Sequence, residues 1–327
     1  MASLEELRSE RIKKLQNLKT EGINPYPIVS HREYSLAEAL LAFPKLSKRK
    51  KPIVLVGRVL ALRKQGGLIF LNFSDGTETL QAMMKKDDLK NGSFQLFADN
   101  IDIGDFVEFT GSLFITKRKE KSILVKGWRM LAKSLRPLPD QWAGLSDVEE
   151  RFRKRYLDTL MSAEVKERFV MRSRMITTLR SLLDKEGFLE VETPILQHHA
   201  GGATATPFTT HHNALDVPLH LRIAPELYLK ELLIGGFPKV YEMGRNFRNE
   251  GIDATHNPEF TMLEFYEAYS DTRKLMVFME RMIKATVKTL FKKQNIPYGD
   301  NPIDFSKKFQ VVSYLDLLKR YALITHP

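Results

Sequence analysis

The strongest constraint on the fold is a series of short alternating strands between Ile53 and Leu131. Five segments alternate apolar with polar residues and therefore predict strands: IVLVGRVLALR, LIFLNFSD, TLQAMM, DFVEFTGSLFIT and SILVKGWRML. Glycine-containing turns separate the segments at Gly66-Gly67, Asp75-Gly76 and Gly104. With a helix-like insert over 86–98, this pattern is typical of a five-stranded Greek-key barrel of the OB type.

The sequence on both sides of the barrel divides the chain further. Two helix candidates, over 3–21 and 35–42, precede a basic run, KLSKRKK, over 45–51. Such a run is typical of a solvated linker or of an RNA-facing edge. The two prolines of Arg136-Pro137-Leu138-Pro139 mark a boundary after the barrel. We therefore expect four parts: an N-terminal helical extension (1–50), an OB-fold domain (51–135), a linker (136–160) and a second domain (161–327).

The second domain combines long helices with strands. The residue pattern predicts a charged helix over 147–161 and an amphipathic helix over 162–186, with Gly187 as the C-cap of the latter. A further amphipathic helix is expected over 275–290. Strands are expected at FLEVETPIL, HLRIA, KVYEMGRNF and EFTMLEFYEAY. The predicted fold class is therefore α+β, in which a mostly antiparallel sheet flanked by helices follows the barrel.

The charge of the chain and its lack of cysteine narrow the functions open to it. Lys and Arg number 51 against 40 Asp and Glu, and the resulting net charge of +11 favours polyanionic partners. With no cysteine, the chain has no thiolate nucleophile and no Cys-ligated zinc. No stretch approaches about 18 uninterrupted apolar residues, and the N-terminus lacks the apolar region of a secretory signal. We therefore expect a cytoplasmic location and no membrane partner.

A polar segment between two predicted strands carries the residues best suited to chemistry. Because residues two apart share a face of a strand, Arg248 and Glu250 are expected to point the same way, as are Glu264 and Tyr266. An arginine suits a phosphate, and a phenylalanine such as Phe260 suits the face of a purine. Taken alone, these residues equally fit an ordinary surface hairpin with ion pairs.

Several stretches of the sequence carry recognisable motifs. The stretches RNFRNEG and HNPEFTMLEFY resemble motif 2 of the class II lysyl-tRNA synthetases of the bacterial type, and EGFLEVETPIL, which contains Pro194, resembles motif 1 of that class. Three further stretches resemble the lysine enzymes: RPLPDQWAGLSDVEERFRKRYLD, THHNAL and RIAPELYLK. The predicted barrel resembles their anticodon-binding OB domain. The resemblance extends over essentially the whole chain.

This resemblance implies a lysine–tRNA ligase, which activates lysine with ATP to lysyl-adenylate and transfers it to the 3′ end of tRNA(Lys). The implied partners are ATP, L-lysine and tRNA(Lys), with Mg²⁺ brought by ATP. A homodimer formed through the motif 1 region is also implied. Arg248 matches the catalytic arginine that, in the family, bridges the carboxylate of the amino acid and the α-phosphate of ATP.

The resemblance also implies three groups of binding residues. Those matching the ATP site are Arg248, Glu250, His256, Asn257 and Phe260. Those matching the lysine site are Gly202, Glu226, Arg248, Glu264 and Tyr266, with Glu226 on the α-ammonium group. Those matching the anticodon site are Arg63, Phe70 and Gln81. The alternatives are a core position for Phe70 and a helix-capping role for Glu226.

The match departs from the family at two places. Thr206 stands in the loop 201–208 where the family commonly has an arginine. No stretch after Gly251 resembles motif 3, the part of the family's site that is accompanied by its principal Mg²⁺ ligands. We therefore expect no metal ligand in this chain, and a fragment or truncated derivative that does not aminoacylate unaided. The histidine doublets at 198–199 and 211–212 predict no chelate, because neighbours in a strand point apart.

Two other functions remain open on the sequence. One is an aspartyl- or asparaginyl-tRNA synthetase relative, although those enzymes typically carry a glutamine where Glu226 stands. The other is a tRNA-binding paralogue that has lost catalysis.

Overall fold

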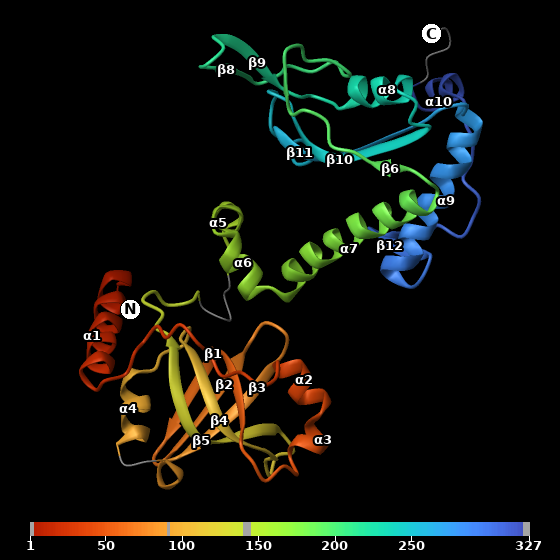
Figure 1. The fold of residues 1–327 in the computed structure, drawn as a ribbon. Helices are drawn as coiled ribbons and strands as arrows, with labels where there is room; N and C mark the ends of the chain where they lie inside the picture. The colour runs from red at the N-terminus through yellow and green to blue at the C-terminus, as the bar shows by residue number, and fades with distance from the viewer. Residues whose placement is uncertain (1–2, 90–91, 140–144, 323–327) are drawn as a thin grey trace. The chain divides into compact units, whose positions relative to one another are not determined.

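A computed structural model describes residues 3–89, 92–139 and 145–322 (Figure 1). The chain forms two units, Met1–Ser162 and Ala163–Pro327, each with its own internal packing. Residues 90–91 of the predicted insert and 140–144 of the predicted linker lie outside the described residues.

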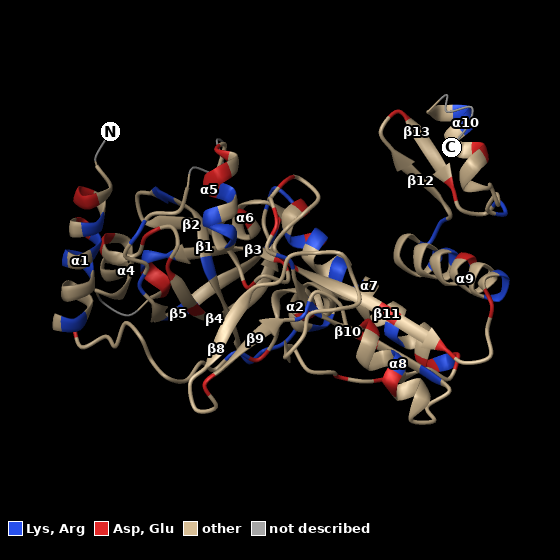
Figure 2. Cartoon of the chain, turned by 90° about the horizontal axis from the view of Figure 1, so that it is seen from above, with Lys and Arg blue, Asp and Glu red and all other residues tan. Residues whose placement is uncertain are grey.

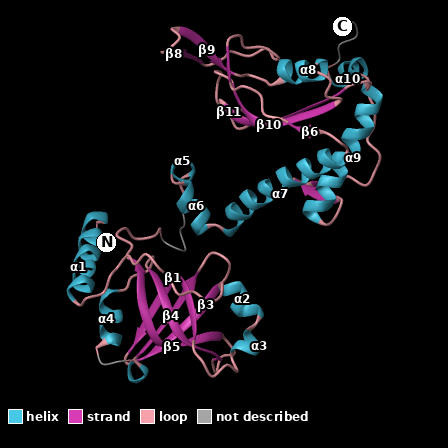
Figure 3. Ribbon diagram, in the orientation of Figure 1, coloured by secondary structure: helices cyan, strands magenta, loops and turns pink. Residues whose placement is uncertain are grey.

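The first unit is built on a closed five-stranded barrel, as the sequence predicts (Figure 3). Its strands are β1 (Ile53–Gln65), β2 (Leu68–Ser74), β3 (Thr79–Lys85), β4 (Phe106–Ile115) and β5 (Lys121–Ala132). They follow the order β1-β2-β3-β5-β4, and pairing between β1 and β4 closes the barrel. All neighbours are antiparallel except β3 and β5, which run parallel.

Every second side chain along β2 points into the barrel and fills its core. On β2, Ile69, Leu71 and Phe73 are buried, whereas the residues between them are half-buried and face outward. The ring of Phe73 packs edge-on against that of Phe109, with 5.1 Å between centroids. A side chain at Gly111 would collide with the backbone of Leu124, so the close approach of β4 and β5 requires glycine there.

Short helices surround the barrel. They are α1 (Leu4–Thr20), α2 (Leu36–Leu41), α3 (Phe43–Leu46) and α4 (Ser93–Asn100), with a 3₁₀ turn η1 (Lys86–Asp88) before α4. Ser3 and Ser35 begin α1 and α2 with capping boxes. Arg11 fastens α1 to the barrel, since its guanidinium donates to the carbonyls of Ser134 and Ile103 at 3.0 and 2.9 Å.

The prediction of one continuous helix over 147–161 is wrong. The segment forms α5 (Val148–Arg153) and α6 (Arg155–Met161), which are separated at Lys154, where φ is −115° and ψ is 49°. The cause is the buried carboxylate of Asp158, which accepts from Arg151 at 2.9 Å and from Arg155 at 2.5 Å. An arginine seven residues before Asp158 reaches it only because the helix axis changes between them.

The second unit contains the predicted antiparallel hairpin, which lies between two long helices in the sequence. Strands β10 (Lys239–Phe247) and β11 (Glu259–Glu267) are antiparallel, and the short β6 (Leu189–Glu190) runs parallel to β10. Helices α7 (Ala163–Lys185) and α9 (Thr272–Phe291) pack against one face of this sheet. The rings of Phe188, Phe265 and Phe278 lie 5.5–5.7 Å apart in the core between them.

The predicted strand FLEVETPIL is wrong as a single element. Only β6 and β7 (Leu196–Gln197) pair, and they belong to different sheets. Thr193 instead directs its hydroxyl to the Glu242 carboxylate at 2.6 Å, and Pro194 has no N–H to donate to a ladder. The second sheet has the order β7-β9-β8, with β8 (Thr209–His212) and β9 (Val217–Leu221). The predicted strand HLRIA therefore ends at Leu221.

Four more elements complete the described part of the chain. Helix α8 (Glu226–Ile234) precedes β10, and the hairpin β12 (Asn295–Tyr298) and β13 (Asn301–Asp304) follows α9. Helix α10 (Tyr314–Tyr321) comes last among the described elements. The sequence analysis expected neither the hairpin β12–β13 nor α10.

Candidate functional site

The hairpin β10–β11 presents one apolar and one polar face. Tyr241, Leu263 and Phe265 pack into the core beneath α7 and α9. Residues of the opposite parity therefore share the other face, which we call the polar face: Glu242, Asn246, Phe260, Glu264 and Tyr266. Glu242 lies directly opposite Glu264, and Asn246 directly opposite Phe260. The structure thus brings three of the predicted site residues onto one surface.

Arg248 joins this surface from just beyond the end of β10. The prediction that Arg248 and Glu250 share a strand face is wrong, because β10 ends at Phe247 and both residues lie in the following loop. Arg248 is held at two points: its backbone N–H donates to the Pro258 carbonyl at 2.8 Å, and its guanidinium carbon lies 5.1 Å from the centroid of the Phe260 ring. Its Nε is buried and has no hydrogen-bond partner among the described residues.

The loop 201–208 docks onto the residues that follow Arg248. The Asn249 backbone N–H donates to the Thr206 carbonyl at 2.8 Å, and the Thr206 N–H lies 3.4 Å from the Glu250 carboxylate. Thr206 therefore fixes this loop through its backbone, at the position where the resembling family commonly has an arginine.

Glu226 is the first residue of α8 and lies against the loop glycine. Gly202 has a φ of +85°, and a Cβ there would lie 2.8 Å from the Cβ of Glu226. This position therefore requires glycine on two counts. The N-cap of α8 is Pro225, and no side chain caps this helix. The capping role considered for Glu226 is accordingly wrong; its carboxylate instead contacts the Lys230 ammonium at 2.5 Å.

The carboxylates on and beside the polar face influence one another. Burial raises the pKa of Glu264, and the nearby Glu226 and Glu242 carboxylates raise it further, whereas a hydrogen bond from Tyr266 and the charge of Arg248 oppose the rise. The Tyr266 hydroxyl donates to the Glu264 carboxylate at 3.0 Å. Burial also raises the pKa of Tyr266, and the neighbouring Glu264 adds to that rise. The site thus places the Glu264 carboxylate near two other carboxylates and near the Arg248 guanidinium.

A buried ion pair lies on the polar face itself. The guanidinium of Arg222 contacts the Glu242 carboxylate, and both side chains are almost completely buried. Arg222 also donates to the Arg245 carbonyl at 2.9 Å and to the Thr193 hydroxyl at 3.0 Å. A side chain at Gly244 would collide with the Arg222 guanidinium. Sequence reasoning missed this pair, although an arginine and a glutamate within predicted apolar strands were a signal for it.

Asn246 is a second feature that sequence reasoning missed. Its side chain is 1% exposed, and neither its amide nitrogen nor its oxygen has a hydrogen-bond partner among the described residues. A buried carboxamide in this condition is uncommon, because burial without a partner costs about 1–3 kcal/mol. It lies on the same face as Phe260, two residues before Arg248, whose Nε is also unpaired.

Two predicted ATP-site residues lie outside this cluster. His256 is exposed, and its Nδ1 lies 2.8 Å from the Asp253 carboxylate. Backbone hydrogen bonding from Thr255, followed by the contact with His256, holds the pKa of Asp253 well below its usual range. Asn257 is also exposed. Within the described ranges, no hydrogen bond or ion pair connects either residue to Arg248.

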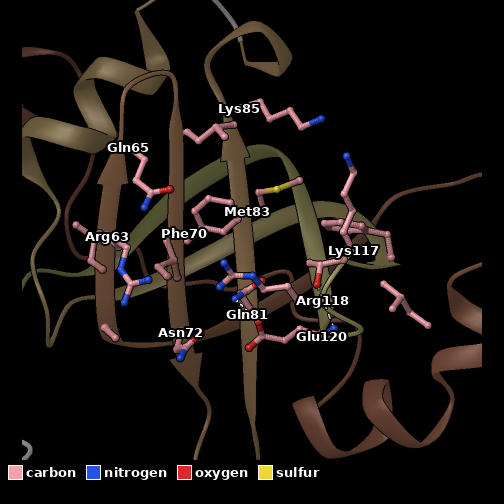
Figure 4. A pocket seen from close by; sticks show the side chains of 17 residues that line it. Arg63, Gln65, Phe70, Asn72, Gln81, Met83, Lys85, Lys117, Arg118 and Glu120 are labelled. Carbon is pink, nitrogen blue, oxygen red and sulfur yellow. Dashed lines mark hydrogen bonds between the residues drawn. The ribbon is translucent and has the colours of Figure 1, made fainter.

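In the barrel, the predicted anticodon residues line one groove of about 1060 Å³ (Figure 4). Arg63 on β1 lies directly opposite Phe70 on β2, and Gln81 on β3 lies opposite Asn72. Phe70 is half-buried and faces outward between the buried Ile69 and Leu71. The alternative that Phe70 belongs to the barrel core is therefore wrong.

Two hydrogen bonds hold the Gln81 side chain in the groove, and most of the charged residues that line the groove are cations. The Gln81 amide donates to the Glu120 carboxylate at 2.7 Å, and its oxygen accepts from the Ser122 hydroxyl at 2.8 Å. Residues of the groove that the sequence did not predict include Asn72, Met83, Lys85, Lys117, Arg118 and Glu120. Asn72, Met83 and Lys85 share strand parity with Phe70 and Gln81, so alternation alone was a signal for them.

Within residues 3–89, 92–139 and 145–322, no group of three or more histidine or acidic side chains could hold a metal ion. Across the same ranges, no helix is long and apolar enough to cross a membrane.

Comparison with known proteins matches both units to families. Residues 53–131 match the OB-fold nucleic acid binding domain, and residues 147–326 match the tRNA synthetases class II (D, K and N). The first match coincides with the barrel, and the second contains the hairpin β10–β11, Arg248 and α8.

Individual relatives extend the similarity over almost the whole chain. A lysine–tRNA ligase of Dehalococcoides mccartyi is 43% identical over 322 residues, which cover 97% of this chain and 64% of the relative. Lysine–tRNA ligases of Chloroflexus aurantiacus and Pelotomaculum thermopropionicum are each 45% identical, over 92% and 98% of this chain. The match covers 62% of the length of each of these two relatives.

The family predicted from the motifs is thereby confirmed. An OB-fold barrel precedes a helix-flanked antiparallel sheet whose polar face carries the motif 2 residues. Since the synthetase match alone covers more than half of the sequence, the chain belongs to the class II tRNA synthetases of the D, K and N group.

Proposed function

We propose that the full-length protein is a lysine–tRNA ligase that forms lysyl-adenylate from lysine and ATP and transfers lysine to tRNA(Lys). The proposal concerns the full-length protein because this chain spans only 62–64% of the relatives it matches. The observation that carries it is the grouping of Glu226 and Glu264 beside Arg248. Two carboxylates next to one arginine suit a ligand with two ammonium groups and one carboxylate.

In the proposed activation step, Arg248 orients and stabilises the reacting groups. An oxygen of the lysine carboxylate attacks the α-phosphorus of ATP, a new P–O bond forms, and the bond to pyrophosphate breaks. No protein nucleophile is needed, so catalysis depends on positioning and on charge stabilisation. The unpaired Nε of Arg248 and its planar guanidinium suit simultaneous contact with a carboxylate and a phosphate. Mg²⁺ bound with ATP would neutralise part of the phosphate charge.

ATP would bind above the Arg248–Phe260 pair. The Phe260 ring offers a face for the adenine, and it already lies beneath the Arg248 guanidinium. We assign the remaining contacts to Glu250, His256 and Asn257 on the loop after β10, following the match to motif 2.

Lysine would lie across the polar face. We assign the α-ammonium to Glu226 and to the backbone of Gly202, and the ε-ammonium to Glu264 and Tyr266. The contact between Glu226 and the Lys230 ammonium supports the first assignment, because it shows that the carboxylate accepts an alkylammonium group. Glu264 is half-buried and forms no ion pair among the described residues, and a carboxylate in that condition is costly without a cation, so the site favours a dibasic ligand over aspartate or asparagine.

The barrel would read the anticodon. Phe70 offers a stacking surface, Gln81 offers an amide edge and Arg63 offers a cation, which together suit bases of a single-stranded RNA loop. We also propose the four-part division into 1–50, 51–135, 136–160 and 161–327, a homodimer through the motif 1 region, and a cytoplasmic location.

Aminoacylation by the full-length protein tests this function. We expect charging of tRNA(Lys) with lysine and not with aspartate or asparagine. The Glu226→Gln variant should lose lysine charging, since its amide cannot neutralise an ammonium group. Charging with aspartate or asparagine by the unaltered protein would contradict the lysine assignment. Binding of tRNA without charging by any amino acid would support the non-catalytic paralogue.

A further inference from the structure

A group of exposed cations extends from the groove of the barrel. Four lie on the segment that begins within α3 and continues to β1, three lie on the turn between β4 and β5, and one is the first residue of β5. We call them the basic strip: Lys45, Lys48, Lys50, Lys51, Lys117, Arg118, Lys119 and Lys121. Within the described part of the chain, none of the eight forms an ion pair with a carboxylate. Arg49, in the middle of the first segment, differs because it pairs with Glu33 at 3.0 Å.

The two halves of the strip lie next to each other although they are far apart in sequence. The Lys121 ammonium lies 5.3 Å from the ring centroid of Phe43, the first residue of α3. The pairing of β1 with β4 aligns Ile53 with Gly111 and Val54 with Thr110. The residues before Ile53 therefore run beside the end of β4, toward the turn that carries Lys117 to Lys119. Figure 1 shows α2 and α3 together on one side of the barrel.

The strip is continuous with the groove. Lys117 and Arg118 belong to both, because they line the groove on the side of the β4–β5 turn (Figure 4). Glu120 is the acidic residue that lines the groove, and its carboxylate is engaged by the Gln81 amide. The cations of the turn are thus exposed, and no carboxylate among the described residues pairs with them.

We propose that the basic strip binds the phosphodiester backbone of the RNA strand that leaves the groove, which is one strand of the anticodon stem. This inference rests on the proposed function, since it takes the groove to hold the anticodon loop. Closely spaced lysines without acidic partners suit successive phosphates, and such contacts position the RNA without reading its sequence. The strip therefore contributes affinity and salt dependence, while Phe70 and Gln81 contribute base selectivity.

Binding of an anticodon stem-loop RNA to the full 327-residue chain at several salt concentrations tests the proposal. Two double variants, Lys45→Gln with Lys48→Gln and Lys50→Gln with Lys51→Gln, each remove two charges from the strip. Each is expected to reduce the slope of log K against log salt by about 1 for every phosphate that the variant no longer binds. Discrimination between the lysine anticodon and a base-substituted loop should stay unchanged.

A matched control removes two charges from a helix outside the strip. Helix α1 carries exposed lysines (blue in Figure 2), and Lys13→Gln with Lys19→Gln should leave the salt slope at its original value. Equal slopes for the strip and control variants would overturn the proposal. So would a loss of binding to anionic phospholipid vesicles with RNA binding unchanged, since the strip would then serve a membrane surface. Absence of base discrimination in the unaltered chain, with the slope effect present, would contradict the anticodon assignment and leave the backbone contact standing.

Discussion

Arg248 is the residue on which the proposed chemistry depends most. Its replacement by alanine removes the stabilisation of charge on the α-phosphate, so we expect ATP–pyrophosphate exchange by the full-length protein to fall about 10²–10³-fold or more. Arg245 provides a matched control, because it is exposed and its position on β10 has the opposite parity to the residues of the polar face. Its guanidinium lies 3.5 Å from the Glu259 carboxylate. The Arg245→Ala variant should keep most of its exchange rate. Equal losses in the two variants would contradict the role given to Arg248.

The raised pKa of Glu264 predicts how lysine binding responds to pH. In the free protein its pKa is raised above the ordinary value of 4.5, chiefly by burial. An ammonium ligand needs the ionised form, so lysine affinity should be complete above this raised pKa and decline as the pH falls through it. Calorimetric titration with lysine over a pH series checks this, and Glu264→Gln should bind weakly at every pH. An unaltered protein whose affinity is constant across the acidic range would contradict the assignment.

The same raised pKa has a consequence for stability. A carboxyl group whose pKa is higher in the folded than in the unfolded state contributes most stability at low pH, and this contribution is lost as the pH rises through the folded value. Glu264→Gln should therefore raise the thermal midpoint of the ligand-free protein at neutral pH while it weakens lysine binding. A lower midpoint in this variant would indicate that the amide disturbs the polar face.

Among the elements, the end of β5 depends on a buried ion pair. The Lys133 ammonium lies 2.7 Å from the Asp105 carboxylate, and both side chains are fully buried. Lys133→Met leaves this carboxylate without its cation, so we expect a loss of about 3–5 kcal/mol in the free energy of unfolding. The exposed Lys126, which pairs with Asp88 at 2.6 Å, is the control. Lys126→Met should cost less than about 1 kcal/mol in urea denaturation followed by circular dichroism.

Elements whose pattern is local were predictable from the sequence. The five barrel strands follow strict alternation, and the same alternation now places Phe70 outside the core, between Ile69 and Leu71. The helix break at Lys154 and the interrupted strand around Thr193 were not predictable. At Lys154 the break accompanies the contact of Arg151 with Asp158, and at Thr193 the strand is interrupted by a tertiary contact with Glu242; each contact outweighs the local preference.

In the candidate site, too, contacts between residues far apart in the sequence could not be predicted. The family resemblance predicted Arg248, Phe260, Glu264 and Tyr266, and β-strand parity brings the last three to one face. The buried pair of Arg222 and Glu242 went unpredicted because its members are 20 residues apart in sequence and meet only in the folded unit. Asn246 went unpredicted because nothing in the sequence marks it as buried.

At the scale of the whole molecule, the chain consists of two units, Met1–Ser162 and Ala163–Pro327. The barrel has its own core and its own groove, so a polypeptide of residues 1–162 should fold alone. We expect it to bind the anticodon stem-loop with an affinity within a few-fold of the full chain. Melting curves and RNA titrations of the two polypeptides check this. An unfolded polypeptide, or a large loss of affinity, would mean that the second unit contributes to this binding.

The most direct measurement is ATP–pyrophosphate exchange by the full-length protein with each of the twenty amino acids in turn. It reports adenylate formation alone and therefore separates the chemistry of the polar face from RNA binding by the barrel. We predict exchange with lysine alone, with Arg248→Ala as the inactive reference. Exchange driven by aspartate or asparagine would contradict the pairing of Glu226 and Glu264 with the two ammonium groups. No exchange with any amino acid would contradict the enzymatic function itself.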